Sequence, residues 1–319
     1  MEMPITLSLP SGSVLISGSL SHIPDYSFRL ISRSQELLAY ERGYKLSNFS
    51  IPSQRDLKQQ FRILDEFMNH PFYAESFVNE NSQLNRYSDV PTYRQTQVPL
   101  LSGSGFINAN YINGAETPAD DKLFIATQGP LPNTINDFWK MVWQENSSSI
   151  FMLVNENECE CGRCEIYWPK QWETLQADNI TINCIARTKY PGYIVSDLRI
   201  QMNESEIRPV RHYLFTDWPD RGIPGDTNSF NELLKQLDIE KPVRTGPIVV
   251  HCSAGVGRTG TFIALDCLKK IIDSQKTQNV DLGVSVFSVV RRLREQRILM
   301  VQTDLQYGWL YRFVQRWLS

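Results

Sequence analysis

The chain has 319 residues, of which 41% are hydrophobic and 11% aromatic, with a formal net charge of −3 at pH 7. That length can bury a full core as one large domain or as one domain with an extension. The small acidic surplus argues against nucleic acid or an anionic membrane as the main partner, because such proteins usually carry a basic surplus. No apolar run reaches about 18 residues, and residues 1–10 lack the features of a signal peptide, so we expect a cytoplasmic protein.

Six cysteines are too few for a disulfide framework in a chain of this length, so we expect reduced thiols. Three of them, Cys159, Cys161 and Cys164, form a Cys-x-Cys-x2-Cys cluster. Structural zinc normally takes four ligands, and no fourth cysteine or histidine lies near in the sequence. The sequence therefore predicts no metal site and no cofactor.

Residues 1–52 are rich in serine, and prolines separate their short apolar pieces, so we treat them as an N-terminal extension of unknown role. This extension either packs on the rest of the chain in a partly ordered form or serves as a tail that binds a partner. From Ser53 the pattern changes, because apolar residues from Leu57 to Met68 recur at helical spacing, and Ser53 with Asp56 resembles a helix cap. We place the main domain at residues 53–319.

Several segments predict a framework of strands and helices. Residues 110–113 alternate as in a strand, Gly-Pro-Leu-Pro at 129–132 is typical of a turn, and residues 137–143 have the apolar spacing of a helix. Residues 150–154 are uniformly apolar, which predicts a central buried strand, and a polar loop leads from there to Tyr167. The β-rich pieces between residues 179 and 214, divided by Pro191 and Gly192, predict an antiparallel meander.

Residues 215–224 predict a loop, since Pro219, Gly222 and Pro224 disfavour a helix or a strand. A bulky Trp218 at its hinge would let such a loop close over a pocket as a unit.

Residues 247–272 predict a buried strand, a turn and a helix. Ile248, Val249 and Val250 form the apolar run, and helical spacing begins at Phe262. The residues of the turn are small, and Gly255 and Gly257 can take positive φ, so the backbone N–H groups from 253 to 258 can converge at a helix N-terminus. We call this concave arrangement of N–H groups the bowl. An arrangement of this kind binds an anion.

Two side chains at this bowl point to chemistry. The same amides and helix dipole favour the thiolate form of Cys252, which makes it a candidate nucleophile. Arg258, at the far end of the bowl, can bind two phosphate oxygens with its planar guanidinium. The alternative interpretation is a buried structural cysteine beside a glycine-rich turn.

After this helix, Val286, Val289, Val290 and Leu293 predict another amphipathic helix. Its arginines are interpreted as a solvated face: Arg291, Arg292, Arg294 and Arg297.

The segment His-Cys-Ser-Ala-Gly-Val-Gly-Arg-Thr-Gly at 251–260 resembles the signature loop of the protein tyrosine phosphatases. Residues 83–90 resemble the family's phosphotyrosine-recognition loop, residues 215–224 its mobile Trp-Pro-Asp loop, and residues 296–307 its glutamine loop. The resemblance covers about residues 55–319 and points to the tyrosine-specific, cysteine-dependent branch, with a non-receptor-like single catalytic domain. It implies an α/β fold with a strongly twisted mixed sheet flanked by helices, and an active site at the C-terminal end of the strand that reaches His251.

The resemblance also implies roles for individual residues. It makes Cys252 the nucleophile, Arg258 the phosphate ligand, Asp220 the general acid and base, Gln302 the residue that positions water, and Thr259 a donor to the departing thiolate. It assigns substrate binding to Tyr87, Asp89, Ser253, Ala254, Gly255, Val256, Gly257, Gln306 and Arg221. It assigns supporting roles to Glu158, His251 and Trp218.

Some of these assignments have competitors. Glu158 is the acidic residue expected to orient Arg258, and Glu156 competes with it because loop counts can slip. Asp217 is the alternative to Asp220, and Gln306 has a structural alternative as a cap of the helix after Thr303. Leu299 stands where many members of the family have glycine, which would narrow one side of the pocket.

The implied activity is hydrolysis of phosphotyrosine in proteins through a phosphocysteine intermediate, without a metal. We expect a monomer that neither binds nucleic acid nor inserts into membranes. A dual-specificity phosphatase is one alternative, and the Asn-Arg-Tyr segment at 85–87 argues against it because a deep pocket rejects short phosphoserine. A phosphoinositide phosphatase usually has basic residues inside the signature loop, which are missing here. A catalytically weak phosphotyrosine-binding module is the alternative from another class, and the presence of Cys252, Arg258 and Asp220 argues against it.

Overall fold

The computed structural model describes residues 35–68, 77–78, 82–102, 105–114, 122–219 and 222–319. Within these ranges, eight strands form a mixed sheet in the order β3-β4-β10-β5-β9-β8-β7-β6, and β1 pairs with β2 separately. The strands are β1 Phe77–Val78, β2 Thr92–Tyr93, β3 Ala109–Ile112, β4 Phe124–Thr127, β5 Ser149–Met152, β6 Thr174–Ala177, β7 Ile180–Tyr190, β8 Tyr193–Met202, β9 Ile207–Phe215 and β10 Ile248–His251. The α-helices are α2 Gln35–Arg42, α3 Gln54–Met68, α5 Ile135–Gln144, α6 Glu156–Glu160, α7 Thr227–Val243, α8 Gly257–Gln278, α9 Val286–Gln296 and α10 Asp304–Leu318. Three 3₁₀ turns complete the described elements: η2 Leu46–Asn48, η3 Ser82–Leu84 and η4 Pro132–Thr134.

The centre of the sheet is parallel. β10 pairs in parallel with β4 and β5, and β5 pairs in parallel with β9. These strands are uniformly buried, which explains their continuous apolar sequences, and the predicted central strand at 150–154 is confirmed as β5. In register, His251 lies beside Thr127 and Met152, so the carboxyl ends of three neighbouring strands meet at one edge. Ligand sites in open α/β sheets form at this edge.

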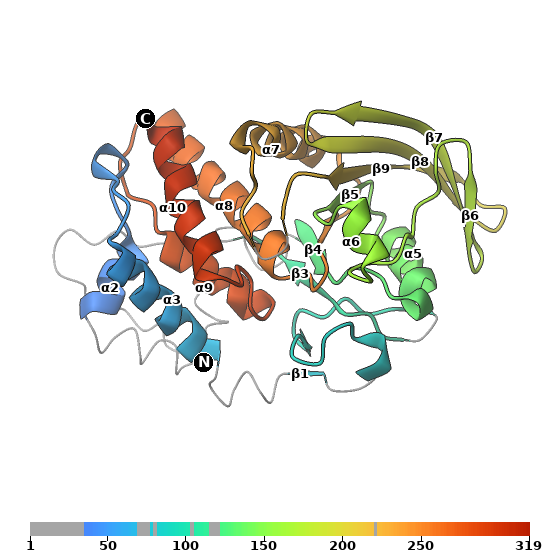
Figure 1. Ribbon diagram of the computed structural model, residues 1–319, viewed down its shortest axis with the longest axis horizontal. Helices are drawn as coiled ribbons and strands as arrows, with labels where there is room; N and C mark the ends of the chain where they lie inside the picture. The colour runs from blue at the N-terminus through green and yellow to red at the C-terminus, as the bar shows by residue number, and fades with distance from the viewer. Residues whose placement is uncertain (1–34, 69–76, 79–81, 103–104, 115–121, 220–221) are drawn as a thin grey trace, which may run out of the picture.

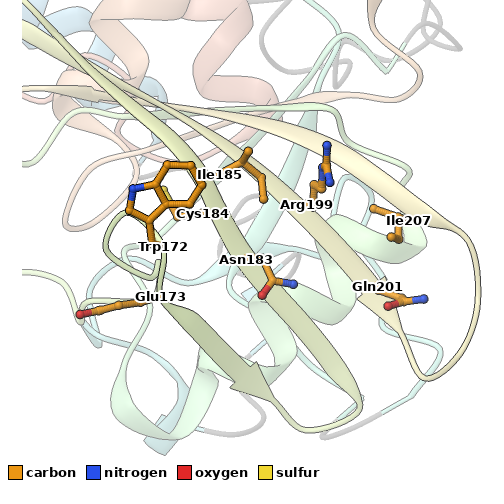
Figure 2. A pocket seen from close by; sticks show the side chains of 8 residues that line it. All are labelled: Trp172, Glu173, Asn183, Cys184, Ile185, Arg199, Gln201 and Ile207. Carbon is orange, nitrogen blue, oxygen red and sulfur yellow. The ribbon is translucent and has the colours of Figure 1, made fainter.

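The other half of the sheet is antiparallel, and the predicted meander is confirmed as β7, β8 and β9. The turn at Pro191 contains Gly192 with φ +80°, a conformation that glycine adopts without strain. A hollow of about 300 Å³ lies on these strands and is lined by Trp172, Cys184 and Arg199 among others (Figure 2). The strands that contribute to its lining include β7, β8 and β9, and the nearest of these, β9, is separated from β10 by β5. The hollow is therefore away from the edge at which β10 ends with His251.

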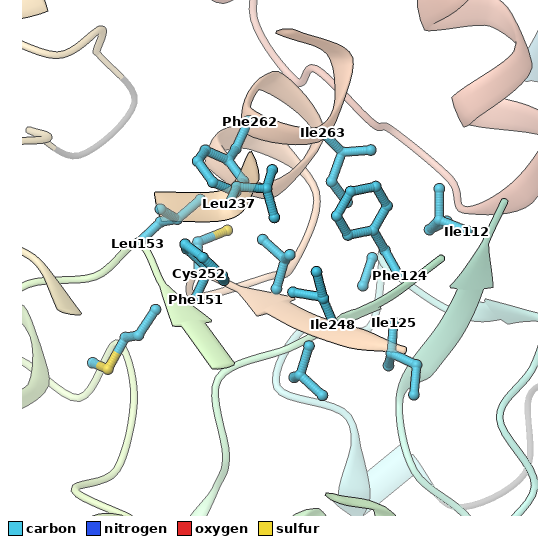
Figure 3. Packing of buried hydrophobic residues seen from close by; sticks show 14 of the residues in the cluster. Ile112, Phe124, Ile125, Phe151, Leu153, Leu237, Ile248, Cys252, Phe262 and Ile263 are labelled. Atoms are coloured by element: carbon cyan, nitrogen blue, oxygen red, sulfur yellow. The ribbon is translucent and has the colours of Figure 1, made fainter. Parts of the chain in front are cut away.

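Helices α3, α8, α9 and α10 pack together on one side of the sheet's parallel half (Figure 1). The expected start of α3 is confirmed, because the Ser53 hydroxyl accepts a hydrogen bond from the Asp56 amide at 3.2 Å. The apolar face of α8 meets the sheet at Phe262, whose ring lies 5.4 Å from that of Phe151 (Figure 3). The helices therefore cover the strand that leads to Cys252.

The described part of the N-terminal extension packs on the helical layer. Tyr44 forms an antiparallel bridge with Val284, and the amide of Leu46 donates to the Asp281 carboxylate at 2.6 Å. Glu41 forms a salt bridge with Arg291 at 2.5 Å. Residues 38–49 thus contact the domain that sequence analysis begins at residue 53.

The interpretation of the α9 arginines as a solvated face is wrong for three of the four. Arg291, Arg294 and Arg297 are 4%, 1% and 0% exposed. Each guanidinium has partners inside the protein, which a burial pattern based on apolar residues alone does not reveal. Arg294 pairs with Asp65 at 2.7 Å and donates to the carbonyl groups of residues 300 and 301.

Candidate active site

The candidate nucleophile lies directly after β10. Cys252 is 5% exposed and is surrounded by apolar side chains of the sheet and α8, including Phe151, Leu153 and Phe262 (Figure 3). The chain then turns and enters α8 at Gly257. The predicted strand, turn and helix are confirmed, and the turn occupies the carboxyl edge of the parallel strands.

The turn from 252 to 257 exposes backbone N–H groups. Within the described residues, none of the N–H groups of residues 253–257 donates to a backbone carbonyl. Gly255 has φ +72°, and a Cβ there would lie 2.1 Å from the carbonyl oxygen of Thr127, so only glycine fits. Of the two glycines that could take positive φ, Gly255 does so, whereas Gly257 is the first residue of the helix.

A buried arginine holds the outer side of this turn. Arg297 donates to the carbonyl oxygens of Ala254 and Gly255 at 3.0 and 2.9 Å, and to the side chains of Asn108 and Asn110. Since these carbonyl groups face Arg297, the N–H groups of the turn are directed to the opposite side. Burial lowers the pKa of Arg297 to about 10, which leaves it charged at neutral pH. Sequence analysis missed the role of Arg297 because it assigned this residue, with the other arginines of the segment, to the solvent-exposed side of an amphipathic helix.

Arg258 is held by two hydrogen bonds to one carboxylate. Its Nη1 and Nη2 donate to Glu158 Oε2 and Oε1 at 2.8 and 2.6 Å, and Nη1 also donates to the Leu153 carbonyl oxygen at 2.9 Å. Glu156, the competing residue, instead pairs with Arg187 at 2.5 Å. Of the two acidic residues that sequence analysis left open, Glu158 is therefore the one that orients the guanidinium.

Glu158 lies in a short helix, α6, that sequence analysis took as part of a polar loop. Asn155 caps α6, because its side chain accepts from the Glu158 amide at 3.0 Å. The Glu158 carboxylate accepts in turn from the Asn155 amide at 3.2 Å. This reciprocal cap fixes the direction of the Glu158 side chain before any ligand binds.

Thr259 and two glutamines surround the start of α8. Thr259 Oγ1 is buried and has no hydrogen-bond partner among the described residues, so its hydroxyl is free to serve a neighbouring group. A Cβ on Gly257 would lie 3.1 Å from Gln302 Oε1 and 3.3 Å from Gln306 Nε2. Gln306 also caps α10, since its Oε1 accepts from the amide of the N-cap residue Thr303 at 3.3 Å, and it accepts from the Gln302 amide at 3.0 Å as well. The structural alternative for Gln306 is therefore present in the fold.

Tyr87 borders the turn from the other side. Its hydroxyl lies 2.9 Å from Ser253 Oγ and accepts from Arg163 Nη1 at 3.2 Å. Asp89 is exposed two residues later. Tyr87 and Leu299 both pack on a small apolar cluster that contains Val256, and Leu299 has φ +57°. The recognition segment and the signature turn are thus in direct contact.

His251 lies in a buried row of polar groups. Tyr167 Oη contacts Nε2 of His251 at 2.6 Å and Nε2 of His212 at 2.8 Å. His251 Nδ1 lies 3.0 Å from the Cys252 carbonyl oxygen, so its proton belongs on Nδ1, and Tyr167 then donates to Nε2. Burial lowers the pKa of His251 to about 4 and that of His212 to about 3, so both rings are neutral at neutral pH. His212 is a neighbour that sequence analysis did not single out.

The loop at 215–224 is anchored by Trp218. Its ring is 1% exposed, packs against Phe230 and Trp309, and donates to the Gly222 carbonyl oxygen at 3.0 Å. The Asp217 carboxylate accepts from the Asp226 amide at 3.0 Å at the start of α7. Asp220 and Arg221 lie outside the described residues.

Other classes of site are not seen in the described ranges. No group of three or more His, Cys, Asp or Glu residues there is arranged to hold a metal ion. Likewise, none of the helices described is long and apolar enough to cross a membrane.

Comparisons with known proteins agree with this geometry. The family model for protein-tyrosine phosphatase matches residues 81–316. A Lar-like tyrosine-protein phosphatase of Caenorhabditis elegans is 37% identical over 248 residues, which are 76% of this chain and 11% of that protein. Receptor-type tyrosine-protein phosphatase eta of Homo sapiens is 40% identical over 251 residues, which are 76% of this chain and 18% of that protein. The chain therefore spans about a tenth to a fifth of the length of these curated relatives.

Solved structures give the same result for the fold. A structure of PTPN18 superposes with a TM-score of 0.74 at 32% identity, covering 82% of this chain and 95% of that one. PTPN18 has also been solved in complex with HER2 phosphopeptides, with the same TM-score. The α/β fold expected from the sequence, a mixed sheet flanked by helices, is confirmed. The chain belongs to the protein-tyrosine phosphatase family.

Proposed function

We propose that the chain hydrolyses phosphotyrosine in proteins through a phosphocysteine intermediate. One observation carries the proposal: Cys252 opens a turn of unpaired backbone N–H groups, and Arg258 is already oriented at the far end by Glu158. This arrangement binds three phosphate oxygens while leaving the phosphorus open to the sulfur.

In the first step, the Cys252 thiolate attacks phosphorus and the bond from phosphorus to the phenolic oxygen breaks. Asp220 gives its proton to the departing oxygen, so that tyrosine leaves as the neutral phenol. The amides of residues 253–258 and the Arg258 guanidinium stabilise the charge on the equatorial oxygens. Asp217 is the weaker candidate for the acid, because its carboxylate already accepts the Asp226 amide at the start of α7.

In the second step, water attacks phosphorus and the bond from phosphorus to sulfur breaks. Asp220 now takes a proton from the water, and Gln302, which lies over the start of α8, positions it. The hydroxyl of Thr259, buried without a partner, donates to the thiolate that is regenerated. Gln306 assists by holding the backbone of Gln302.

Substrate recognition is assigned to the rim of the turn. Tyr87 forms the wall against which the substrate ring packs, and Asp89 accepts from substrate backbone amides. Arg221 adds a positive charge at the rim. The names of the relatives and the PTPN18 complexes with HER2 phosphopeptides support phosphotyrosine proteins as the substrate class.

We also infer a cytoplasmic, monomeric, non-receptor-like protein that needs no cofactor and binds no nucleic acid, with an extension at 1–52 and a catalytic domain at 53–319. The net charge of −3 supports the last of these exclusions. Several curated relatives are receptor-type proteins, and localisation of the tagged protein in cells distinguishes the two forms.

The test is phosphate release from matched phosphotyrosine and phosphoserine peptides. We expect turnover of the phosphotyrosine peptide alone and complete loss in Cys252→Ser. Asp220→Ala should lower kcat by about 10²- to 10⁴-fold and keep the peptide bound, because the acid acts only as the bond breaks. Equal turnover of both peptides would indicate a dual-specificity enzyme, and no turnover with intact binding would indicate a binding module.

A further inference from the structure

Two cysteines next to the active site face each other across a tight turn. Cys159 lies in α6, and Gly162, with φ +74°, reverses the chain so that Cys164 returns to it. The Gly162 amide donates to the Cys159 carbonyl oxygen at 2.9 Å, and the Arg163 amide donates to that of Glu158 at 3.0 Å. The Cys164 thiol donates to the Glu165 carbonyl oxygen at 3.2 Å, and its sulfur is also within hydrogen-bond reach of the Cys159 thiol. The backbone of the turn thus brings the two cysteines side by side.

The surroundings make the two thiols unequal. Cys164 is fully buried, and burial raises its pKa. The hydrogen bond from Cys164 lowers the pKa of Cys159, which is 9% exposed. The Arg86 guanidinium, bound to the carbonyl oxygens of Gly129 and Gly162, lowers the pKa of both thiols. Cys159 is therefore the thiolate that an oxidant meets first.

We propose that Cys159 and Cys164 form a second redox site, in which peroxide converts the two thiols to a disulfide without participation of Cys252. The Cys159 thiolate attacks one peroxide oxygen, the O–O bond breaks, and the released hydroxide takes a proton to become water, which leaves a sulfenic acid. The Cys164 sulfur then attacks the sulfenic sulfur, the S–O bond breaks, and the leaving hydroxide takes the Cys164 proton. The dithiol loses two electrons, and one peroxide becomes two waters.

The disulfide would affect the proposed phosphate site through two adjacent groups, one next to each cysteine. Cys159 directly follows Glu158, the partner of Arg258. Cys164 Sγ packs behind the signature turn, because a Cβ on Gly129 would lie 2.9 Å from that sulfur and 2.8 Å from the Cys252 carbonyl oxygen. Formation of the disulfide moves the two sulfur atoms closer together, and this shifts both Glu158 and the packing behind the signature turn. This consequence, unlike the bond itself, rests on the proposed function, and we expect roughly tenfold weaker phosphopeptide binding, as when a supporting partner is lost.

The sequence allows the bond to be mapped directly. Trypsin cuts after Lys140, Arg163 and Lys170, so Cys159 and Cys164 fall in separate peptides, 141–163 and 164–170, and Cys252 falls in 245–258. The full chain is treated with mild peroxide, free thiols are alkylated, and the unreduced digest is analysed by mass spectrometry. We expect 141–163 joined to 164–170 in wild type and Cys252→Ser. Cys161→Ser, which changes the exposed cysteine of the same turn, is the matched control and keeps the bond, whereas Cys159→Ser abolishes it.

A link from 164–170 to 245–258, a bond that requires Cys161, or two free thiols at Cys159 and Cys164 would overturn the proposal. Peptide affinity is then measured in Cys252→Ser before oxidation, after oxidation and after reduction. Reversible weakening that disappears in Cys159→Ser combined with Cys252→Ser supports the effect on the phosphate site, and unchanged affinity overturns that effect. Failure of untreated Cys252→Ser to bind the peptide would count against the proposed phosphatase function, while the mapped bond would stand.

Discussion

Replacing Glu158 by glutamine tests whether the preset guanidinium is the source of phosphate affinity. The Glu158 and Arg258 side chains are 15% and 5% exposed, so solvent screens this pair only weakly. Glutamine keeps the shape and one acceptor oxygen, but it presents an amide N–H₂ to the second guanidinium nitrogen. The two bonds of 2.8 and 2.6 Å therefore become one neutral bond and one repulsive contact.

The size of the effect follows from the lost bond. A hydrogen bond to a charged group contributes about 1.5–3 kcal/mol, and about 1.4 kcal/mol corresponds to a factor of ten. We therefore expect kcat/KM to fall by about 10- to 100-fold. The Leu153 carbonyl oxygen still holds Nη1 at 2.9 Å, which prevents a complete loss. Because Arg258 binds the phosphate in the ground state as well, KM should rise together with the fall in kcat.

The assay is steady-state hydrolysis of a phosphotyrosine peptide, with the vanadate inhibition constant as a measure of oxyanion affinity. Glu156→Gln is the matched control, since Glu156 lies two residues away and pairs with Arg187 instead. Thermal unfolding identifies the temperature at which both variants remain folded. If Glu158→Gln kept kcat/KM within about threefold of wild type, or if Glu156→Gln lost as much, orientation by Glu158 would not be the source of affinity.

Three further outcomes are expected. Gly257→Ala should lower kcat about tenfold with little change in KM or Tm, because the added methyl would lie only 3.1 Å from Gln302 Oε1 and would push that side chain away. A burst of product followed by slow turnover would show this effect. Burial lowers the pKa of His251 from 6.5 to about 4 and that of His212 to about 3, so the unfolded state binds both protons first. The free energy of unfolding measured by urea denaturation should therefore fall as pH drops from about 6.5 to 4, by about 3 kcal/mol for each ring, and constant stability would contradict neutral burial. Exhaustive chelation should leave activity intact because Arg258 and backbone amides supply the positive charge, and loss restored by added metal would refute this.

The sequence was sufficient to predict the signature turn and the strand and helix beside it, because the residues that determine these elements are adjacent in the chain. Three β-branched residues followed by small residues and then helical spacing predict the strand, turn and helix without any long-range contact. The identity of the partner of Arg258 could only be narrowed to two residues, since Glu158 and Glu156 lie on one helical turn. The cap by Asn155, which the sequence contains, decides between them once α6 is known to form.

The buried arginines of α9 could not be predicted from the same sequence. Their spacing places them on one side of the helix, and a hydrophobicity pattern assigns any such row to solvent. Each of them has a side-chain partner more than 150 residues away, such as Asn108 for Arg297. A buried cation is stable only when such partners pair with it, and that condition is tertiary. The same reason conceals the thiol contact of Cys159 and Cys164, which depends on the reversal at Gly162.

These arginines make α9 the link between the chain's beginning and its active site. Arg291 pairs with Glu41 in α2, and Arg294 pairs with Asp65 in α3. Arg297 follows three residues later and holds the carbonyl groups of the signature turn. Two arginines of α9 and the arginine at its C-cap thus connect two N-terminal helices to the turn whose amides would bind phosphate. The described part of the extension therefore packs on the same helix whose C-cap arginine holds the signature turn, although the extension is far from that turn in sequence.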